Sequence, residues 1–390
     1  MNEYLPGLQG VPATKSNISN LDGQTGILTY RGYRIQDLAE QSNFEEVALL
    51  LLDGRLPTSA ELAAFDLQVR KNRPVKFNIR EMMKYLPTGG HPMDLLQTAV
   101  ASLGMFYPGD ECLTGEGVCR DLNYVHNMSV KIIARMPTLV TMWEHIRNGY
   151  DPVAPRDDLS YAENFLYMFH GKEPDPFLAR IMDTCLVLHA EHTINASTFA
   201  ALVAASTLAS PYLVVAAAIG TLAGPLHGGA NQRVVEMLEE IGAPNNAKHW
   251  LGKKLAAKEK IWGMGHREYK VKDPRAIILQ GLMEKLVEHR GGKISPLFET
   301  ALALEEACEA ELAPKGVYAN VDFYSGILYS EMGIPPDQFT SLFAVARSAG
   351  WLAHWREQLA DNRIFRPTQV YIGEDVREYV PISVRASDSK

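Results

Sequence analysis

Residues 192–232 read HTINASTFAALVAASTLASPYLVVAAAIGTLAGPLHGGANQ and contain no Asp, Glu, Lys or Arg. A stretch this long without charge is either one membrane span or two packed helices. Ser210 and Pro211 interrupt it in the middle, and each half is shorter than the roughly 20 apolar residues that cross a bilayer. Small residues such as Ala, Ser and Thr let helices pack closely, and a helix without a charged face is normally buried. The stretch therefore predicts two helices in a core or a subunit interface, and no membrane partner.

Helical patterns recur along most of the chain. Residues 42–58, SNFEEVALLLLDGRLPT, begin with a capping residue, Ser42 or Asn43, continue with two glutamates in the first turn, and end on Gly and Pro. Strand-like patterns occur near the two ends. Residues 20–34, NLDGQTGILTYRGYR, suit a small hairpin, and residues 367–384, PTQVYIGEDVREYVPISV, show β-branched alternation. The chain is therefore predicted to be mainly α, with minor β at the termini.

Length and composition restrict the class of protein. A chain of 390 residues is long enough for two domains or one large one. Its net charge of -8 argues against nucleic acid as a partner. None of the four cysteines forms a C-x-x-C pair, and the N-terminal residues have neither the basic nor the apolar segment of a signal peptide. We therefore expect a cytoplasmic protein with reduced thiols.

Two histidines occur three residues apart in LHAEHTINAST, residues 188–198. This spacing predicts that His189 and His192 share one helix face, which Asn195 continues. Zinc needs such a pair and further ligands, but neither H-E-x-x-H nor H-x-x-E-H matches, because residue 188 is Leu. Histidines hydrogen-bonded in a helical core are therefore the favoured interpretation, and no metal site is expected.

Residues 262–276, WGMGHREYKVKDPRA, begin like a dinucleotide-binding loop. Gly263 and Gly265 supply the first two glycines, but residue 268 is Glu, and a charged segment precedes the loop in place of a buried strand. The dinucleotide interpretation therefore fails. What remains is His266 in a glycine-flanked basic loop, which is either an anion site or a solvated turn.

An aspartate and an arginine occur in apolar surroundings. Asp322 in GVYANVDFYSGIL is either the N-cap of the helix that follows or a base whose pKa is raised by partial burial. Arg347 in AVARSAGWLAHWREQ belongs to a strongly apolar helix, and a buried arginine needs an anion from the protein or from a ligand. Together with the histidines, including the glycine-flanked His227 in GPLHGGANQ, this set suits proton transfer near carbonyls on a multiply anionic substrate.

Five segments, in order and with fitting gaps, resemble the signature segments of the citrate synthases: LHAEHTINAST, GPLHGGAN, GMGHREYKVKDPRA, NVDFYSG, and RSAGWLAHWREQ followed by RP. The resemblance covers residues 20–372 and is to the short bacterial type, which lacks the N-terminal extension of the NADH-inhibited enzymes. It implies an acyltransferase that condenses acetyl-CoA with oxaloacetate and hydrolyses citryl-CoA to citrate and CoA. Acetyl-CoA would be a co-substrate, with no permanently bound cofactor.

The resemblance also implies two helical domains. Residues 1–222 and 331–390 would form a large domain for dimerisation and oxaloacetate binding. Residues 223–330 would form a small domain that binds CoA, carries His266 and Asp322, and closes over the large one.

Three catalytic roles follow from the resemblance. Asp322 would take a proton from the acetyl methyl group, His227 would donate a hydrogen bond to the thioester oxygen, and His266 would polarise the oxaloacetate carbonyl and protonate the alkoxide. A carboxylate with an ordinary pKa of about 4 is a weak base for a carbon acid, so a donor aimed at the enolate oxygen is needed, contributing about 3 kcal/mol. We expect the glycine-rich turn to bring the thioester close to His227, and the adjoining helix start to disfavour the imidazolium.

Further positions match the family's substrate ligands. The oxaloacetate ligands match His192, His266, Arg275, Arg347 and Arg366. In the family the last arginine comes from the partner subunit of a homodimer, and two carboxylates facing three arginines suit bidentate recognition. The CoA-binding positions match Lys260, Ile261, Gly263, Met264, Lys270, Lys315 and Asn320.

The segment Tyr107–Asp121 receives no role. A 2-methylcitrate synthase that uses propionyl-CoA is the nearest alternative, because one methylene changes binding by only about 1–3 kcal/mol. A citryl-CoA-cleaving enzyme, a non-catalytic CoA- or citrate-binding protein and a zinc hydrolase are weaker alternatives. The intact set of Asp322, His227 and His266 disfavours a non-catalytic role.

Overall fold

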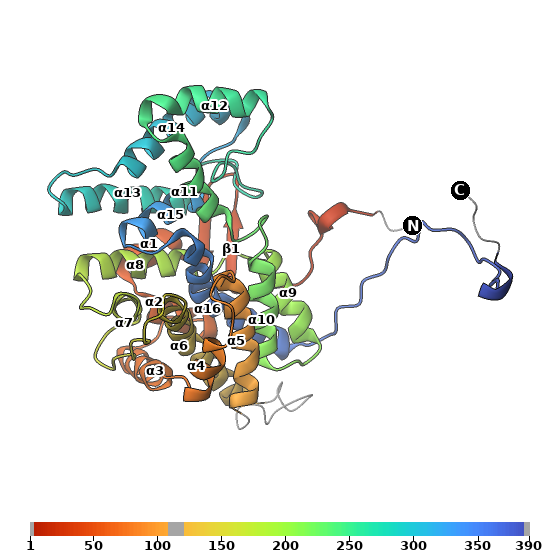
Figure 1. Ribbon diagram of the computed structural model, residues 1–390. Coiled ribbons are helices and arrows are strands. Elements are labelled where there is room, and N and C mark those ends of the chain that lie inside the picture. Colours follow the sequence, from red (N-terminus) through yellow and green to blue (C-terminus); the bar gives the residue numbers. More distant parts are fainter. Residues whose placement is uncertain (1–3, 108–120, 386–390) are drawn as a thin grey trace.

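The structure, a computed structural model, describes residues 4–107 and 121–385. The fold is mainly α-helical, as predicted (Figure 1). The α-helices are α1 (Ile35–Gln41), α2 (Phe44–Asp53), α3 (Ser59–Asn72), α4 (Phe77–Lys84), α5 (Pro92–Phe106), α6 (Leu122–Arg147), α7 (Tyr161–His170), α8 (Pro176–His189), α9 (Ala196–Ser206), α10 (Pro211–Leu222), α11 (Ala230–Ile241), α12 (Ala247–Ala256), α13 (Pro274–His289), α14 (Pro296–Leu312), α15 (Val321–Glu331) and α16 (Phe339–Ala360). The cysteine-containing segment Tyr107–Asp121 lies almost entirely outside the described residues.

The N-terminal part forms a small antiparallel sheet, which confirms the predicted hairpin. Its strands are β1 (Ser19–Asp22), β2 (Ile27–Tyr30) and β3 (Tyr33–Arg34), in that order across the sheet. Ser19 pairs with Tyr30, and the strand positions that face the protein are buried. The turn between β1 and β2 contains Gly23 and Gly26, and it lies against the loop that precedes α13.

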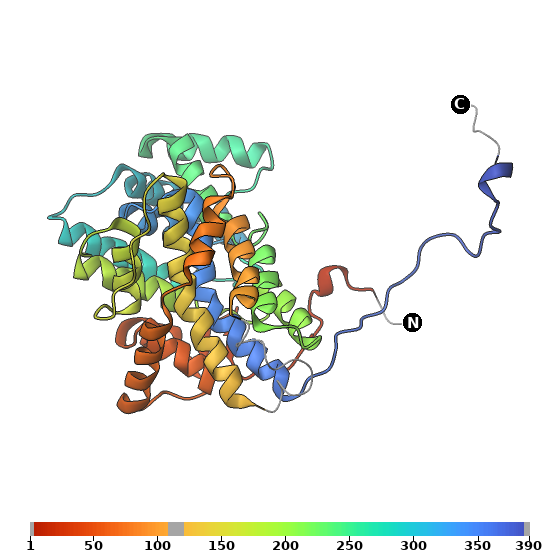
Figure 2. The same cartoon turned by 60° about the horizontal axis from the view of Figure 1, so that its bottom comes forward.

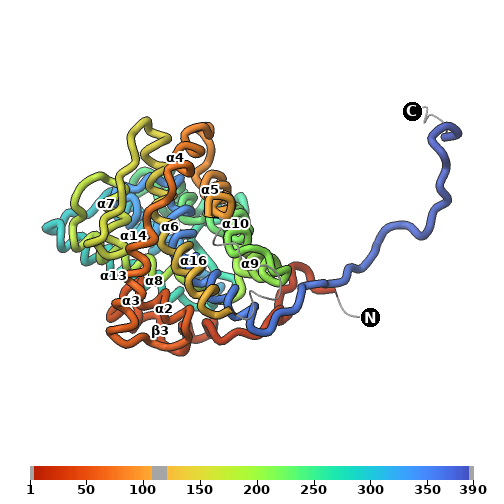
Figure 3. Tube along the Cα trace, turned by 90° about the horizontal axis from the view of Figure 1, so that it is seen from below, coloured from red at the N-terminus to blue at the C-terminus, as the bar shows by residue number. Residues whose placement is uncertain are grey.

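The predicted β-structure at the C-terminus is wrong for the described residues. Residues 367–384 contain only the 3₁₀ turn η7 (Ile382–Val384). After α16 the chain leaves the body as an extended segment (Figure 3), and large apolar side chains along it, such as Ile372, are exposed. A strand must satisfy its backbone hydrogen bonds with a neighbouring strand, and the described chain places none beside this segment. Its β-branched pattern therefore reflects a segment that lacks a partner surface within one chain.

The uncharged stretch forms the two helices predicted for it. α9 and α10 pack against each other, and Pro211 occupies the first turn of α10, where its missing N–H costs nothing. α10 also packs on α5. Across the described ranges, no helix is both long and apolar enough to cross a membrane. Two apolar side chains nevertheless remain exposed, Val203 on α9 and Leu213 on α10.

Helix α16 forms the centre of the body. Residues 339–355 of this helix are buried, which agrees with its apolar sequence. α6 runs beside it (Figure 2), and α2, α8, α9 and α10 pack on its other sides. α2 follows the sequence prediction closely, since Asn43 caps it by accepting from the N–H of Glu46 at 2.8 Å and Gly54 ends it in the left-handed conformation. The buried stretch of α16 therefore carries polar residues, including Arg347, into the core.

Helices α11 to α15 lie together at one end of the molecule (Figure 1). α12 packs on α14, and both α11 and α13 pack on α15. This group meets the rest of the chain where α11 contacts α16 and where α13 contacts α1 and α8. The group spans residues 230–331 and so nearly coincides with the predicted small domain, residues 223–330; the division into two domains and its closure stay predictions.

Candidate active site

The segment between α8 and α9 carries His192. α8 ends at His189, so the prediction that His192 and Asn195 continue its helix face is wrong. The N–H of Gly350 in α16 donates to the carbonyl oxygen of Ala190 at 3.1 Å, and this tertiary contact holds the chain away from a further helical turn. Asn195 instead caps α9.

Helix α16 approaches this segment very closely at Gly350. A Cβ at this position would lie 2.3 Å from Glu191 Oε2 and 2.4 Å from the carbonyl oxygen of Ala190, so only glycine fits without a shift. The buried Glu191 carboxylate accepts hydrogen bonds from the Ser19 hydroxyl and from His354 Nε2, both at 3.0 Å. The segment is thus anchored between β1 and α16 directly before its second histidine.

His189 is a core histidine, as the favoured interpretation held. It is completely buried, and its Nδ1–H donates to the carbonyl oxygen of Cys185 at 2.8 Å. Burial lowers its pKa to about 3, so the ring is neutral. In the described part of the chain, no group of three His, Cys, Asp or Glu side chains is arranged to hold a metal ion.

His192 faces a second histidine and a tyrosine. Its ring centre lies 5.1 Å from that of His266, in an edge-on arrangement. The ring of Tyr269 lies 5.6 Å from His192 and 4.8 Å from His266, and its hydroxyl oxygen is 3.2 Å from His192 Nε2. Burial, together with the nearby Arg275, lowers the pKa of His192 well below its ordinary value, so this ring is also neutral.

His266 lies in the loop between α12 and α13. Its Nδ1 accepts from the N–H groups of Glu268 at 3.1 Å and Tyr269 at 3.4 Å. Burial, together with Arg275, lowers its pKa to about 4. A neutral ring whose Nδ1 is an acceptor carries its proton on Nε2. His266 therefore offers an N–H donor to a ligand.

His227 lies in the turn between α10 and α11. Its Nε2 accepts from the N–H of Ser197 at 3.2 Å and lies 2.8 Å from the Ser197 hydroxyl, which also accepts from Trp351 Nε1 at 3.2 Å. Burial, with a contribution from Arg347, lowers its pKa to about 4. The expectation of a neutral ring is met, and burial is the main cause; an effect of the helix start stays a prediction. Since Nε2 is the acceptor, the proton is on Nδ1.

The glycines of this turn serve close packing. The N–H of Gly228 donates to the carbonyl oxygen of Leu222 at 2.9 Å, and a Cβ on Gly228 would lie 2.5 Å from the same oxygen. None of the three glycines around His227 has a positive φ. The predicted tight turn is therefore present, and it folds back on the end of α10 by close approach.

Arg275 forms a bidentate ion pair with the carboxylate of Asp273. Its Nε and Nη2 donate to Oδ1 and Oδ2 at 3.0 and 2.7 Å, and both side chains are almost completely buried. Asp273 also caps α13, and its Oδ2 accepts from the N–H of Val321 at 3.3 Å at the start of α15. The pair thereby joins two helix starts. Within the described chain, Nη1 of Arg275 has no hydrogen-bond partner.

Arg347 is buried, as predicted, with 1 % of its surface exposed. Its Nε donates to the carbonyl oxygen of His189 at 2.7 Å, and its guanidinium lies 4.7 Å from the ring centre of Phe343. Neither Nη finds an acceptor in residues 4–107 or 121–385, and burial lowers the pKa to about 10. A buried guanidinium fork without a carboxylate partner is suited to bind an anionic ligand.

Asp322 is the second residue of α15. Asn320 caps this helix by accepting from the N–H of Asp322 at 2.9 Å, so the alternative that Asp322 is the cap is wrong. Its Oδ1 is buried and has no hydrogen-bond partner among the described residues. Burial raises the pKa of Asp322 to about 6, against the opposing effect of Arg275. The carboxylate is a stronger base than an ordinary aspartate and is still mostly ionised at neutral pH.

These side chains form one cluster at the junction between the α11–α15 group and the body. Their charges act on one another: Arg347 contributes to the lowered pKa values of His227 and His192, and it opposes the raised pKa of Asp322. Neutral N–H donors, guanidinium groups with free N–H donors and a carboxylate of raised pKa therefore meet in a single place. Such a set can bind a carboxylate ligand and transfer protons beside a carbonyl group.

Arg366 is the predicted ligand that the chain does not bring to this cluster. It lies exposed on the extension after α16, where its Nη1 donates to the carbonyl oxygen of Pro367 at 2.9 Å. The preceding Phe365 donates its N–H to Ser206 Oγ at 3.2 Å. Ser206 ends α9, which is about 16 Å long, whereas His192 precedes its start.

The predicted CoA segment runs beside the cluster. Met264 forms a β-bridge with Ala319, and the N–H of Asn320 donates to the carbonyl oxygen of Gly263 at 2.9 Å. Met264 and its neighbour Ile261 have buried side chains. The three lysines of the set are exposed, namely Lys260, Lys270 and Lys315. The paired backbone at Met264 and Ala319 and the nearby lysine charges thus lie close to His266. CoA binding itself stays a prediction.

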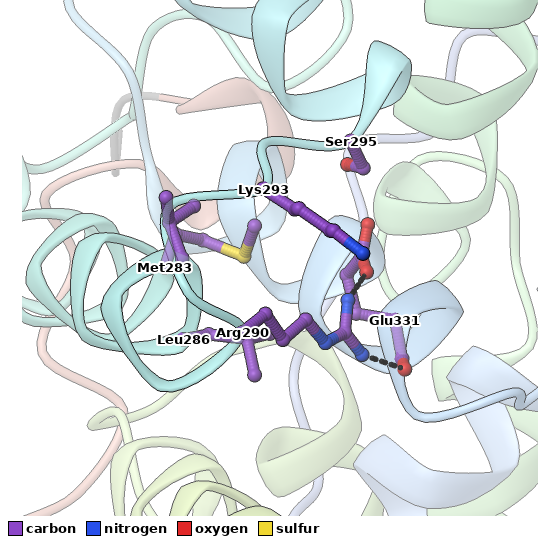
Figure 4. Close-up of a pocket in the computed structure, with 7 residues that line it drawn as sticks. Met283, Leu286, Arg290, Lys293, Ser295 and Glu331 are labelled. Carbon is purple, nitrogen blue, oxygen red and sulfur yellow. Dashed lines mark hydrogen bonds and ion pairs between the residues drawn. The ribbon is translucent and has the colours of Figure 1, made fainter.

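A separate hollow lies between the ends of α13 and α15 (Figure 4). Arg290 forms an ion pair with the Glu331 carboxylate there and donates to the Glu331 carbonyl oxygen at 2.9 Å. The hollow has essentially no room for a water molecule, whereas ligand sites enclose roughly 300 Å³ or more. It contains no histidine or aspartate, and its ion pair ties two helix ends together. We therefore place the active site at the histidine cluster.

Four residues of the site were not predicted from the sequence: Ser197, Asp273, Glu191 and Tyr269. Asp273 had a signal, because Asp before Pro is a common start of a helix. The other three owe their places to contacts with distant segments, which no local pattern records.

Known proteins resemble this chain over its length. The family model described as citrate synthase, C-terminal domain, matches residues 7–368. The citrate synthase of Acidithiobacillus ferridurans is 60 % identical and covers 98 % of each chain. That of Synechocystis sp. is 54 % identical and covers 98 % of this chain and 94 % of the other. A solved ternary complex of carboxymethyl coenzyme A and oxaloacetate with the citrate synthase of Thermoplasma acidophilum has a TM-score of 0.91 at 32 % identity, covering 98 % of this chain and 100 % of that one.

The contact at Gly350 generates a stability prediction. Gly350→Ala should lower the free energy of unfolding by about 1–3 kcal/mol, because overpacking a rigid contact forces backbone shifts. Here the new methyl group would collide with the Ala190 carbonyl oxygen and with Glu191. Urea unfolding followed by circular dichroism measures the change.

Gly252→Ala is the matched control. Gly252 lies in α12, and a Cβ there meets nothing within 4 Å, so this change should stabilise by about 0.5–1 kcal/mol. A Gly350→Ala protein as stable as wild type would show that α16 does not hold the His192 segment.

Proposed function

This chain belongs to the citrate synthase family, and we propose that the clustered side chains perform the family's reaction, in which acetyl-CoA condenses with oxaloacetate and citryl-CoA is hydrolysed to citrate and CoA. The observation that carries the proposal is the buried Arg347, whose guanidinium fork has no acceptor in the described chain. Neutral N–H donors and a carboxylate with a pKa of about 6 surround it. This combination suits a dianionic keto acid and a weakly acidic carbon.

Oxaloacetate has two carboxylates and one ketone. The fork of Arg347 and the free Nη1 of Arg275 supply donors for the carboxylates, with His192 beside them. The Nε2–H of His266 donates to the ketone oxygen and polarises the carbon that will be attacked. Arg366 of the partner subunit supplies the last guanidinium.

Formation of the enol is the difficult step. Asp322 removes one proton from the methyl group of acetyl-CoA, and the electron pair moves toward the thioester oxygen. The Nδ1–H of His227 donates to that oxygen as its charge grows, which is worth about 3 kcal/mol for a pre-positioned donor. The raised pKa of Asp322 favours the same proton transfer.

Condensation and hydrolysis follow. The enol carbon attacks the ketone carbon, and a carbon–carbon bond forms while His266 gives its Nε2 proton to the ketone oxygen; the proton that Asp322 took from the methyl group then restores His266. Water cleaves the thioester of citryl-CoA: its oxygen enters the new carboxylate of citrate, one of its protons goes to the sulfur of CoA, and the other is released to solvent. The reaction needs acetyl-CoA as co-substrate and no permanently bound cofactor or metal. Closure of residues 223–330 over the body would keep water from the enol.

CoA would lie along the segment that carries Ile261, Gly263 and Met264. The buried side chains of this segment support a backbone contact with the ligand. The exposed Lys260, Lys270 and Lys315 would meet its phosphates, and Asn320 would face the acyl arm.

A homodimer would complete the site. Val203 is 39 % and Leu213 is 51 % exposed, and the apolar side chains of the C-terminal extension are exposed as well. Exposed apolar side chains on two packed helices and along an extended segment support a surface that meets a partner, and a two-fold dimer would exchange the two extensions. Cys185 and Cys308 are free and buried, which supports a reducing compartment such as the cytoplasm.

Thiol release tests the reaction. CoA should appear only when acetyl-CoA and oxaloacetate are both supplied to purified, metal-free protein, and acetyl-CoA should have a higher kcat/KM than propionyl-CoA. Ellman's reagent measures the free thiol. Absence of release above background would sink the proposed function. No observation favours the 2-methylcitrate reaction, and a higher kcat/KM with propionyl-CoA would establish it instead.

Asp322→Asn tests the base. The amide preserves the shape of the carboxyl group but cannot accept the proton, so kcat should fall about 100- to 10,000-fold, with little change in the KM for oxaloacetate. Steady-state kinetics measures both constants.

Asp183→Asn is the matched control. Asp183 is another buried carboxyl whose pKa burial raises to about 6, and it accepts from the N–H of Phe44 in α2. It is not part of the cluster, so kcat should stay within about twofold of wild type. Near-normal turnover by Asp322→Asn would remove Asp322 from the mechanism.

Mixed dimers test the trans arginine. Asp322→Asn and Arg366→Ala homodimers should each be nearly inactive, because each has two defective sites. If Arg366 serves the partner's site, a heterodimer of the two variants collects both defects in one site and keeps the other intact. Purified heterodimers carrying two different affinity tags should therefore recover about half of the wild-type kcat.

The same experiment distinguishes the opposite arrangement. If Arg366 served its own chain, every site of the heterodimer would keep one defect and activity would stay low. A dimer formed by mixing Asp322→Asn with wild type, which has one intact site, provides the reference for half activity.

A further inference from the structure

Tyr269 contacts both histidines that face the bound keto acid in the proposed site. Its backbone N–H lies 3.4 Å from His266 Nδ1, and its hydroxyl oxygen lies 3.2 Å from His192 Nε2. Its ring packs against both imidazoles at 4.8 and 5.6 Å. One residue therefore connects two imidazoles that come from distant parts of the chain.

The hydroxyl of Tyr269 makes no second hydrogen bond within the described residues. The side chain is 1 % exposed, and His192 Nε2 is its hydrogen-bond partner there. A buried hydroxyl without a partner is unfavourable, so this contact constrains both groups. Burial raises the pKa of Tyr269 and lowers that of His192, so both partners are neutral.

The N-terminal sheet holds the backbone of Tyr269 in place. The N–H of Lys270 donates to the carbonyl oxygen of Gly23 at 2.8 Å. A Cβ on Gly23 would lie 2.0 Å from the carbonyl oxygen of Glu268, so the β1–β2 turn touches the loop directly. The backbone of Tyr269 is thus held in place. A side chain can position another group only when its own backbone is fixed in this way.

We propose that Tyr269 is a positioning residue for oxaloacetate, which sets the plane of the His192 imidazole and its distance from His266. This inference rests on the proposed function. A neutral imidazole can turn about its Cβ–Cγ bond, and the hydroxyl contact selects one plane. The keto acid held by Arg275 and Arg347 then meets His192 already oriented, and no binding energy is lost in turning it.

Tyr269→Phe removes only the hydroxyl oxygen and keeps the ring packing. The dissociation constant for oxaloacetate should rise about fivefold, the worth of one ordinary hydrogen bond. Isothermal titration with oxaloacetate alone measures it without turnover. The KM for acetyl-CoA and the thermal midpoint should stay close to wild type, because the ring still fills its place.

Two further variants separate positioning from packing. In Tyr161→Phe, the lost hydroxyl donates to the carbonyl oxygen of Ile133 at 2.8 Å between α7 and α6, so stability should fall while oxaloacetate affinity stays unchanged. Tyr269→Leu removes the ring as well, so kcat should fall further than in Tyr269→Phe.

The outcomes are distinct. Weaker oxaloacetate binding by Tyr269→Phe, with acetyl-CoA KM and stability retained, supports the positioning role. Unchanged oxaloacetate binding overturns it, and so does an equal loss of affinity for both substrates together with a lowered thermal midpoint, which marks a purely structural tyrosine. If wild type releases no CoA, the proposed function fails whatever the variants do; if wild type is active and Tyr269→Phe binds oxaloacetate normally, only the positioning role fails.

Discussion

The buried ion pair between Asp273 and Arg275 determines the geometry of the site. Asp273 caps α13, holds Arg275 through two hydrogen bonds, and accepts the N–H of Val321 at the start of α15. Two helix starts therefore meet at one carboxylate, and Asp322 follows directly on α15. Removing one member of a buried pair leaves an uncompensated charge, at a cost of about 3–5 kcal/mol. The position of Asp322, the proposed base, is thus fixed by the same interaction that holds Arg275.

Burial has opposite effects on the acids and bases around this pair. It raises the pKa of Asp322 to about 6 and lowers those of His227 and His266 to about 4, because removal from water disfavours every charged form. The result is a base of increased strength beside two neutral N–H donors. Backbone and hydroxyl contacts then select the tautomers: His266 keeps its proton on Nε2, and His227 keeps its proton on Nδ1. Enclosure and local hydrogen bonding together supply the protonation states that enol chemistry at neutral pH requires.

The sequence predicts those features that depend on local chemistry. The helical fold, the cap at Asn43, the two helices within residues 192–232 and the burial of Arg347 all follow from patterns over a few turns. Predictions fail where a distant segment decides. His192 leaves the helix of His189 because α16 takes the Ala190 carbonyl, and Asn320 caps the helix that was open to Asp322. Tyr269 had no signal at all, since its role depends on a histidine that is 77 positions away in the sequence.

The predicted β-structure of the C-terminal extension failed for a different reason. Its β-branched pattern is real, yet the described chain supplies no strand to pair with it and no core to bury Ile372. An apolar segment that stays exposed loses the hydrophobic contribution of roughly 25 cal/mol per Å² that burial would give. The extension carries Arg366, which does not reach the cluster in the described chain. The free guanidinium donors of the cluster are the fork of Arg347 and Nη1 of Arg275. In the proposed two-fold dimer, each extension would cover the other subunit and bring Arg366 to that subunit's site.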